Sequence, residues 1–249
     1  MHRFVVKETL SDGQRITLSK EESHHAAKVL RLQPGDRVQL LDGSQLWQAV
    51  LITVDEAGTI AETVERLEDS EPPCRAVLWQ GLPKAEKMEW IVQKATELGV
   101  SEIIPIEMER SVAQIVPQKE EKKRERLSRI ALEAAKQSGR VKVPEVYASV
   151  TLEQALKQLS LSENDLFLVA WEEEHAVRMS QVVTEQVRQY GIPQRVVLVI
   201  GPEGGISEQE WLQMKGMGVK AVTLGKRILR TETAGLCALS VLWTVLGEM

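Results

Sequence analysis

The chain has 249 residues, enough for one large domain or two, and 43% of them are hydrophobic. Its formal net charge of -5 argues against a protein that coats nucleic acid with its whole surface, but it allows a local basic face. The two cysteines, Cys74 and Cys237, stand far apart in the sequence, which disfavours a disulfide framework and a zinc site. The charged start and the lack of a membrane-length apolar run predict a soluble, cytoplasmic protein without a signal peptide or a membrane span.

Short apolar runs separated by turn signals occupy the first 67 residues and predict a compact β-barrel. The predicted strands are residues 4–6, 15–18, 37–41, 47–54 and 59–64. Only residues 23–30 have a helical pattern. His24 and His25 are neighbours on that helix and point in different directions, so they do not indicate a metal site.

Residues 55–71 contain seven acids and one base, and they lead directly into Pro72 and Pro73. An acidic segment that ends in prolines is typical of a linker, so we expect the domain boundary here. The predicted domains are therefore residues 1–72 and 73–249.

Beyond this boundary, short apolar runs alternate with amphipathic helical patterns. The predicted strands are residues 76–80, 103–106, 165–170, 196–200 and 221–224. The predicted helices include residues 86–98, 151–159, 179–190 and 234–246. This alternation is typical of an α/β fold with a parallel sheet.

The strand at 196–200 is followed by Gly-Pro-Glu-Gly-Gly at residues 201–205, where backbone can lie against a ligand without an intervening side chain. Ser207 and Glu210 then form an S-x-x-E capping box, which starts a helix whose free N–H groups point back at the loop. On this pattern alone, a ligand site and an ordinary turn built from glycines are equally good interpretations.

Two motifs decide between these interpretations. IGPEGG at residues 200–205 and LGKRILRTETA at residues 224–234 together closely resemble the RsmE family of SPOUT-class methyltransferases. Shorter matches extend over nearly the whole chain, at residues 24–31, 34–36, 97–100, 110–111 and 133–144. The resemblance implies a 16S ribosomal RNA methyltransferase that transfers a methyl group from S-adenosyl-L-methionine to N3 of a uridine. It also implies an N-terminal PUA-like β-barrel and a C-terminal SPOUT domain with a parallel sheet and a deep trefoil knot.

The resemblance further implies that the two motifs bind S-adenosylmethionine, which carries a sulfonium cation, an adenine and an amino-acid end but no phosphate. In keeping with this, the glycine loop matches neither the G-x-G-x-x-G dinucleotide motif nor the Walker phosphate loop. Adenine needs a flat apolar slot with backbone donors and acceptors at its edge. The expected cofactor-binding residues are Ile200, Gly201, Pro202, Glu203, Gly204, Leu224, Gly225, Arg227, Ile228, Leu229 and Thr233.

The expected catalytic residues follow from the chemistry of uridine. N3 is a weak nucleophile while it keeps its proton, and its anion spreads negative charge over N3 and two carbonyl oxygens. A cation at those oxygens would help, and we expect Arg230 first and Arg110 second in this role. Glu203 or Glu232 could accept the proton, although a carboxylate here could instead cap a helix or pair with Arg227.

Residues 119–142 carry nine basic residues against four acids, opposite in sign to the whole chain. A solvated helix face is the commoner explanation of such a run, but the resemblance favours RNA contact by Arg110 and Arg140. The three acids at 172–174 are interpreted as a solvated turn. The expected RNA-binding residues are Arg3, Lys28, Arg31, Arg110 and Arg140.

The last predicted helix, residues 234–246, is apolar on more sides than one sheet face can cover. We expect a homodimer with this helix in the interface, with full burial inside a monomer as the alternative. The other expected partner is ribosomal RNA, in the small subunit or its precursor particle, and no metal is expected. The rival functions are a non-catalytic RNA-binding ribosome assembly factor on a knotted scaffold and a nucleotide-binding protein, which would need a phosphate loop that the sequence lacks.

Overall fold

The structure is a computed structural model that describes residues 2–67, 71–84 and 87–249. The predicted helix start at Glu86 and residues 68–70 of the acidic segment lie outside the described residues. The chain divides into two compact units, Met1–Glu71 with Ala135–Val143 and Pro72–Ala134 with Pro144–Met249.

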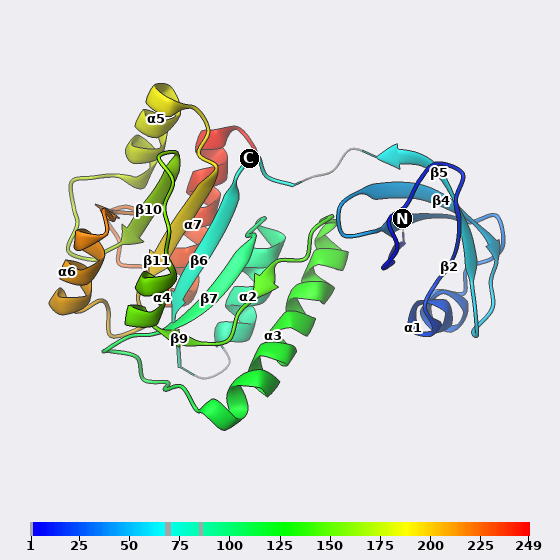
Figure 1. Ribbon diagram of the computed structural model, residues 1–249, viewed down its shortest axis with the longest axis horizontal. Helices are drawn as coiled ribbons and strands as arrows, with labels where there is room; N and C mark the ends of the chain where they lie inside the picture. The colour runs from blue at the N-terminus through cyan, green and yellow to red at the C-terminus, as the bar shows by residue number, and fades with distance from the viewer. Residues whose placement is uncertain (1, 68–70, 85–86) are drawn as a thin grey trace. The chain divides into compact units, whose positions relative to one another are not determined.

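The first unit is a five-stranded sheet in the order β1-β3-β4-β5-β2 (Figure 1). Its elements are β1 (Arg3–Val5), β2 (Arg15–Thr17), α1 (Lys20–His24), the π-helix η1 (His25–Val29), β3 (Arg37–Leu41), β4 (Leu46–Thr53) and β5 (Ile60–Leu67). All five strands predicted in this part of the chain are confirmed. The strands pair antiparallel except for β1 with β3, which is parallel.

The single predicted helix of this unit forms in two pieces. Helix α1 begins at Lys20, three residues before the predicted start. Ser19 caps it by accepting the N–H of Glu22. The chain then continues as η1, which ends at Val29. Shortly after it, Arg31 has a φ of 54°, in the left-handed region, so the helical geometry does not continue. Residues 135–143 complete this unit, because Val141 packs with Leu41 and Leu46 in one apolar cluster.

The second unit is a parallel sheet in the order β12-β10-β11-β6-β7-β8, with β9 paired to β7. Its strands are β6 (Arg75–Gly81), β7 (Glu102–Glu107), β8 (Glu145–Val146), β9 (Val150–Thr151), β10 (Asp165–Ala170), β11 (Arg195–Ile200) and β12 (Lys220–Val222). Its helices are α2 (Lys87–Glu97), α3 (Pro117–Ser138), α4 (Leu152–Gln158), α5 (Met179–Tyr190), α6 (Glu208–Gly216) and α7 (Thr231–Leu246). The predicted α/β fold with a parallel sheet is confirmed.

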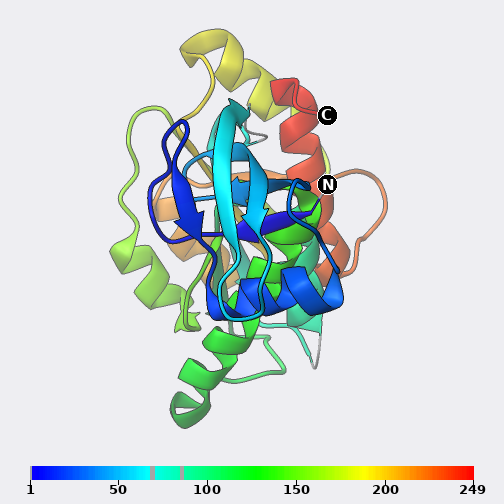
Figure 2. The ribbon, with the colours of Figure 1, turned by 90° about the vertical axis from the view of Figure 1, so that its right-hand side faces the viewer.

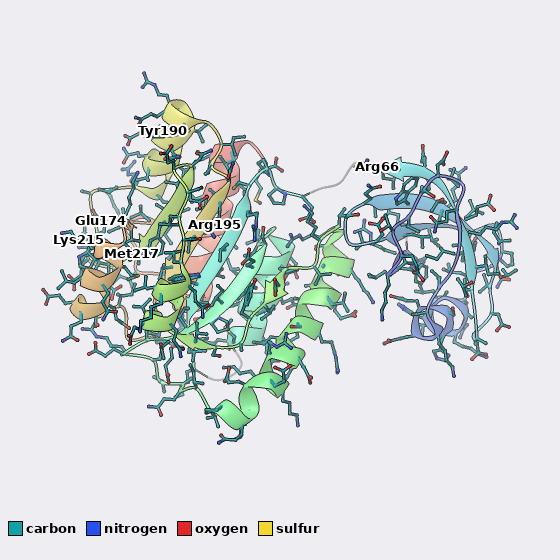
Figure 3. The ribbon with its side chains drawn as sticks, viewed as in Figure 1. Arg66, Glu174, Tyr190, Arg195, Lys215 and Met217 are labelled. Atoms are coloured by element: carbon teal, nitrogen blue, oxygen red, sulfur yellow. The ribbon has the colours of Figure 1, made fainter. Side chains whose placement is uncertain are left out.

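Helices cover both faces of this sheet, which is why its central strands are apolar on both sides. One face packs against α2, α3, α5 and α7, and the other packs against α4 and α6 (Figure 1). Helices α5 and α7 lie side by side in both ribbon views (Figures 1 and 2). At the start of the central strands, Arg195 pairs with Asp165 across β11 and β10 at 2.7 Å (Figure 3).

The ends of the helices show which capping residues and glycines set their boundaries. The capping box at Ser207 and Glu210 forms as predicted and starts α6. Helix α3 ends before Gly139, which has a φ of 83°. Helix α7 begins at Thr231, three residues before the predicted start, with Arg230 at its N-cap. Among the described residues, no helix is both long and apolar enough to cross a membrane.

Candidate cofactor and catalytic site

A cavity of about 250 Å³ opens where β10, β11 and β12 end. Three loops form its walls, at residues 170–175, 200–205 and 222–229, and the first turn of α7 closes one side. Parallel strands of open α/β sheets bring their carboxyl ends to one edge, where such proteins place ligands. The cavity therefore lies where the topology favours a binding site.

Hydrogen bonds join the glycine loop and the turn that follows it to several neighbouring elements. Thr231 Oγ1 donates to the carbonyl oxygen of Gly201 at 2.6 Å, and buried Gln80 Nε2 donates to Thr231 Oγ1 at 2.8 Å. Glu210 accepts the N–H of Ser207 at 2.9 Å with one oxygen and the N–H of Glu109 at 2.8 Å with the other. The loop is thus tied to β6, to α6, to the start of α7 and to the segment after β7.

Most of the expected cofactor-binding residues line the cavity. The cavity wall includes every one of these residues except Thr233, which is exposed on α7. The wall also contains residues that the sequence did not single out for binding, namely Ala170, Trp171, Glu172, His175, Gly205, Val222, Thr223, Lys226, Thr231 and Ala234. No group of three or more His, Cys, Asp or Glu that could hold a metal occurs within the described part of the chain.

The cavity suits a ligand with an apolar ring system and charges of both signs. Gly225 has a φ of 133°, and a Cβ added there would meet nothing within 4 Å, so this stretch of backbone is open to a ligand. A Cβ on Gly201 or Gly204 would instead press on Ile206 or Arg110, so these two glycines serve the packing of the loop itself. Aliphatic side chains, carboxylates and basic side chains all lie on the wall. S-adenosylmethionine has this combination of groups.

Glu203 is bound to a cation that the sequence did not suggest. Lys87 Nζ donates to Glu203 at 2.9 Å and pairs with Glu232 at 3.1 Å, and the Lys84 N–H donates to Glu203 at 3.1 Å. Burial raises the pKa of Glu203, but the hydrogen bonds from Lys87 and from backbone N–H groups outweigh it and leave that pKa below its ordinary value. A carboxylate held ionised in this way is a weak proton acceptor.

Arg230 has no partner of this kind. Its side chain is exposed, and no hydrogen bond or ion pair of its guanidinium occurs among the described residues. The two acids that could hold it, Glu203 and Glu232, are both bound to Lys87. Arg110 lies on the other side of the glycine loop and donates to the carbonyl oxygen of Gly204 at 3.3 Å. Arg230 therefore lies beside the cavity with no carboxylate bonded to it, although it interacts electrostatically with Glu232, whereas Arg110 supports the cavity wall.

The expected RNA-binding residues of the first unit lie in different environments. Arg3 is partly buried and donates to Gln39 at 2.6 Å, and burial lowers its pKa. Lys28 is exposed and pairs with Glu56 at 2.8 Å. Arg31 is exposed, and within the described residues its guanidinium has neither a hydrogen bond nor an ion pair. Arg31 is thus the best placed of the three for a phosphate.

Arg140 belongs to the interior of the first unit. It is 4% exposed, and its guanidinium pairs with Glu71 at 2.6 Å. Glu71 also accepts the N–H groups of Val141 and Lys142, both at 2.9 Å. This arrangement gives Arg140 a structural role and argues against the expected contact with a phosphate.

Relatives of the chain match it over almost its full length. A family model described as RNA methyltransferase domain matches residues 70–243, and another described as RNA methyltransferase PUA domain matches residues 18–57. The ribosomal RNA small subunit methyltransferase E of Bacillus subtilis (strain 168) is 34% identical, over 97% of this chain and 96% of the relative. The protein of that name from Aquifex aeolicus (strain VF5) is 33% identical, over 97% and 99%.

A solved structure gives the same result at the level of the fold. The crystal structure of a ribosomal RNA small subunit methyltransferase E from Neisseria gonorrhoeae bound to S-adenosyl methionine superposes with a TM-score of 0.82. It is 33% identical and covers 98% of this chain and 97% of that one. By sequence and by structure, the chain belongs to the ribosomal RNA small subunit methyltransferase E family.

Proposed function

We propose that this chain transfers a methyl group from S-adenosyl-L-methionine to N3 of a uridine in 16S ribosomal RNA. Membership of the family makes it an S-adenosylmethionine-dependent ribosomal RNA methyltransferase. The observation that supports the assignment most strongly is the cavity at the ends of β10, β11 and β12, which residues of both family motifs line. A phosphate-free cofactor fits these walls, because they offer aliphatic groups and open backbone rather than a nest of N–H groups.

S-adenosylmethionine, when bound, supplies an electrophilic methyl group on a sulfonium. The protein must hold the uridine and favour its N3 anion. Arg230 is the residue that we assign to this task, because its guanidinium makes no hydrogen bond or ion pair with a described residue and it lies at the N-cap of α7 beside the cavity. The proton of N3 passes to solvent or to a nearby base, and Glu203 is the weaker choice of base because Lys87 holds it ionised.

We assign residues 1–72 to a PUA-like RNA-binding domain and residues 73–249 to a SPOUT domain with a trefoil knot in its C-terminal part. The knot is what the resemblance to SPOUT-class methyltransferases implies, and Thr231 at the start of α7 bonds to Gly201 of the glycine loop and to Gln80 of β6. Ribosomal RNA is the macromolecular substrate, and the cytoplasm is where the chain would meet it.

A homodimer through α7 is part of the same proposal. This helix buries one side against the sheet and its neighbours, while Leu236, Val241, Val245 and Leu246 remain only partly buried. Val241 and Val245 lie one turn apart on the same side of α7, and an apolar pair of this kind suits an isologous contact with a second copy.

The test is methyl transfer by the purified chain to small ribosomal subunits from a strain that lacks the gene, with labelled S-adenosylmethionine. Incorporation into 16S ribosomal RNA supports the proposal. The rival, a non-catalytic assembly factor, predicts that the chain binds the particle and transfers nothing. Loss of incorporation in Arg230→Ala, with binding of the particle intact, would also show that the cavity carries the activity.

A further inference from the structure

The charged residues on the cavity wall are not equally available to a ligand. The acids there are Glu172 and Glu203, and the lysine and arginine are Lys226 and Arg227. Glu203 already bonds to Lys87 at 2.9 Å and to the Lys84 N–H at 3.1 Å. The carboxylate of Glu172 has no hydrogen bond or ion pair with any residue that the structure describes. Glu172 is therefore the uncompensated negative charge of this cavity.

The position of Glu172 is fixed by its neighbours. It follows Trp171, whose indole stacks on Trp211 of α6 with ring centroids 4.7 Å apart. The side chain of Glu172 also lies against Gly205, which has a φ of 75°, and a Cβ at that glycine would overlap Glu172 Oε1. The glycine loop thus leaves a place for this carboxylate at the cavity wall.

The adjacent acids have other positions or other tasks. Glu172 and Glu173 are both exposed, but only Glu172 lines the cavity. Glu174 turns the loop, because it accepts the N–H groups of Ala176 at 2.7 Å and Val177 at 2.9 Å (Figure 3). Of the three consecutive acids, Glu172 alone combines a place in the cavity with a free carboxylate. A solvated turn accounts for Glu173, whereas Glu172 also lines the cavity and lies against Gly205.

We propose that Glu172 is a specificity-determining residue that binds a positively charged group of S-adenosylmethionine. The inference rests on the proposed function and deepens it. The donor carries two cations, its sulfonium and its α-ammonium, whereas the product S-adenosylhomocysteine carries only the ammonium. Lys226 and Arg227 line the same cavity and offer cations for the carboxylate of the ligand.

The test compares three ligands that share the adenosine and carry different charged groups. Calorimetry on the full chain measures the affinities of S-adenosylmethionine, S-adenosylhomocysteine and methylthioadenosine, which keeps the adenosine and has no cation. Glu172→Gln removes the charge at nearly constant shape, and we expect S-adenosylmethionine to bind about tenfold to a hundredfold more weakly, as for a lost hydrogen bond to a charged group. Methylthioadenosine should bind as before. Glu173→Gln is the matched control and should change nothing.

The pattern over the three ligands identifies the group that Glu172 binds. A loss confined to S-adenosylmethionine assigns Glu172 to the sulfonium, and an equal loss for S-adenosylhomocysteine assigns it to the ammonium. Glu172→Asp keeps the charge and should recover part of the affinity. An unchanged affinity for S-adenosylmethionine, or a parallel loss for methylthioadenosine, would overturn the inference, since the second result indicates a damaged pocket. If the unmutated chain did not bind S-adenosylmethionine, the proposed function would fail as well.

Discussion

The buried pair of Arg140 and Glu71 gives the sharpest prediction on the first unit. Arg140→Met keeps much of the side-chain volume and removes the charge. Glu71 then stays in the interior, where the N–H groups of Val141 and Lys142 still donate to it. Removing one partner of a buried ion pair costs about 3 to 5 kcal/mol, and because these donors remain we expect the lower end, about 3 kcal/mol. Glu71→Leu should cost more, because it also strands the buried N–H of Val141.

Hydrogen exchange is the assay, because it reports on each unit separately. If the free energy of opening of the first unit falls by about 3 kcal/mol, hydrogen exchange through that opening becomes about 150-fold faster, since about 1.36 kcal/mol corresponds to a factor of ten. We expect this change in peptides from β3 and β4, while peptides from β10 and β11 in the same molecule serve as the internal reference. Arg129→Met, at an exposed position of α3, is the control variant and should leave both regions unchanged.

The opposite result would show that the reasoning on Arg140 is wrong. If Arg140→Met left exchange in β3 and β4 unchanged and lowered the salt dependence of RNA binding by about one unit of log-log slope, the side chain would be a phosphate contact.

Three further predictions concern RNA, catalysis and assembly. Arg31→Ala should weaken RNA binding and reduce its log-log salt slope by about one, and a filter-binding titration with an unaltered slope would remove Arg31 from the RNA surface. Arg230→Ala should lower the single-turnover rate about a hundredfold or more at saturating S-adenosylmethionine, with partial recovery at high pH, where solvent supplies the uridine anion. Unchanged turnover at neutral pH would exclude that role. Light scattering should give a dimer mass that Val241→Arg reduces to a monomer, and a monomer mass for the unmutated chain at micromolar concentration would contradict the α7 interface.

Local sequence patterns predicted most of the fold because their causes are local. The apolar strand at 165–170 and the helix at 179–190 form with the predicted ends, and Ser207 and Glu210 cap α6 as their spacing requires. The start of α7 was placed three residues late. Its first turn contains Thr231 and Glu232, polar residues whose partners lie on β6 and α2, so the apolar pattern begins only after the helix does.

Local sequence patterns do not predict contacts between distant parts of the chain. Lys87 meets Glu203 and Glu232 only in the folded unit, more than a hundred residues away in sequence. Arg140 lies in a basic run whose composition predicts an exposed position. Its burial depends on the ion pair with Glu71, which lies in another segment of the chain. Glu172 was grouped with its two acidic neighbours, because nothing in three consecutive glutamates tells which one faces Gly205.

The central claim is methylation of uridine N3 by the cavity at the ends of β10, β11 and β12, and nucleoside mass spectrometry tests it most directly. Small ribosomal subunits from a deletion strain are incubated with the purified chain and S-adenosylmethionine, and their 16S ribosomal RNA is digested to nucleosides. The account predicts one new 3-methyluridine, which is absent with Arg230→Ala. Methyl transfer to another atom of uridine or to another base, or an unmodified RNA, would contradict it.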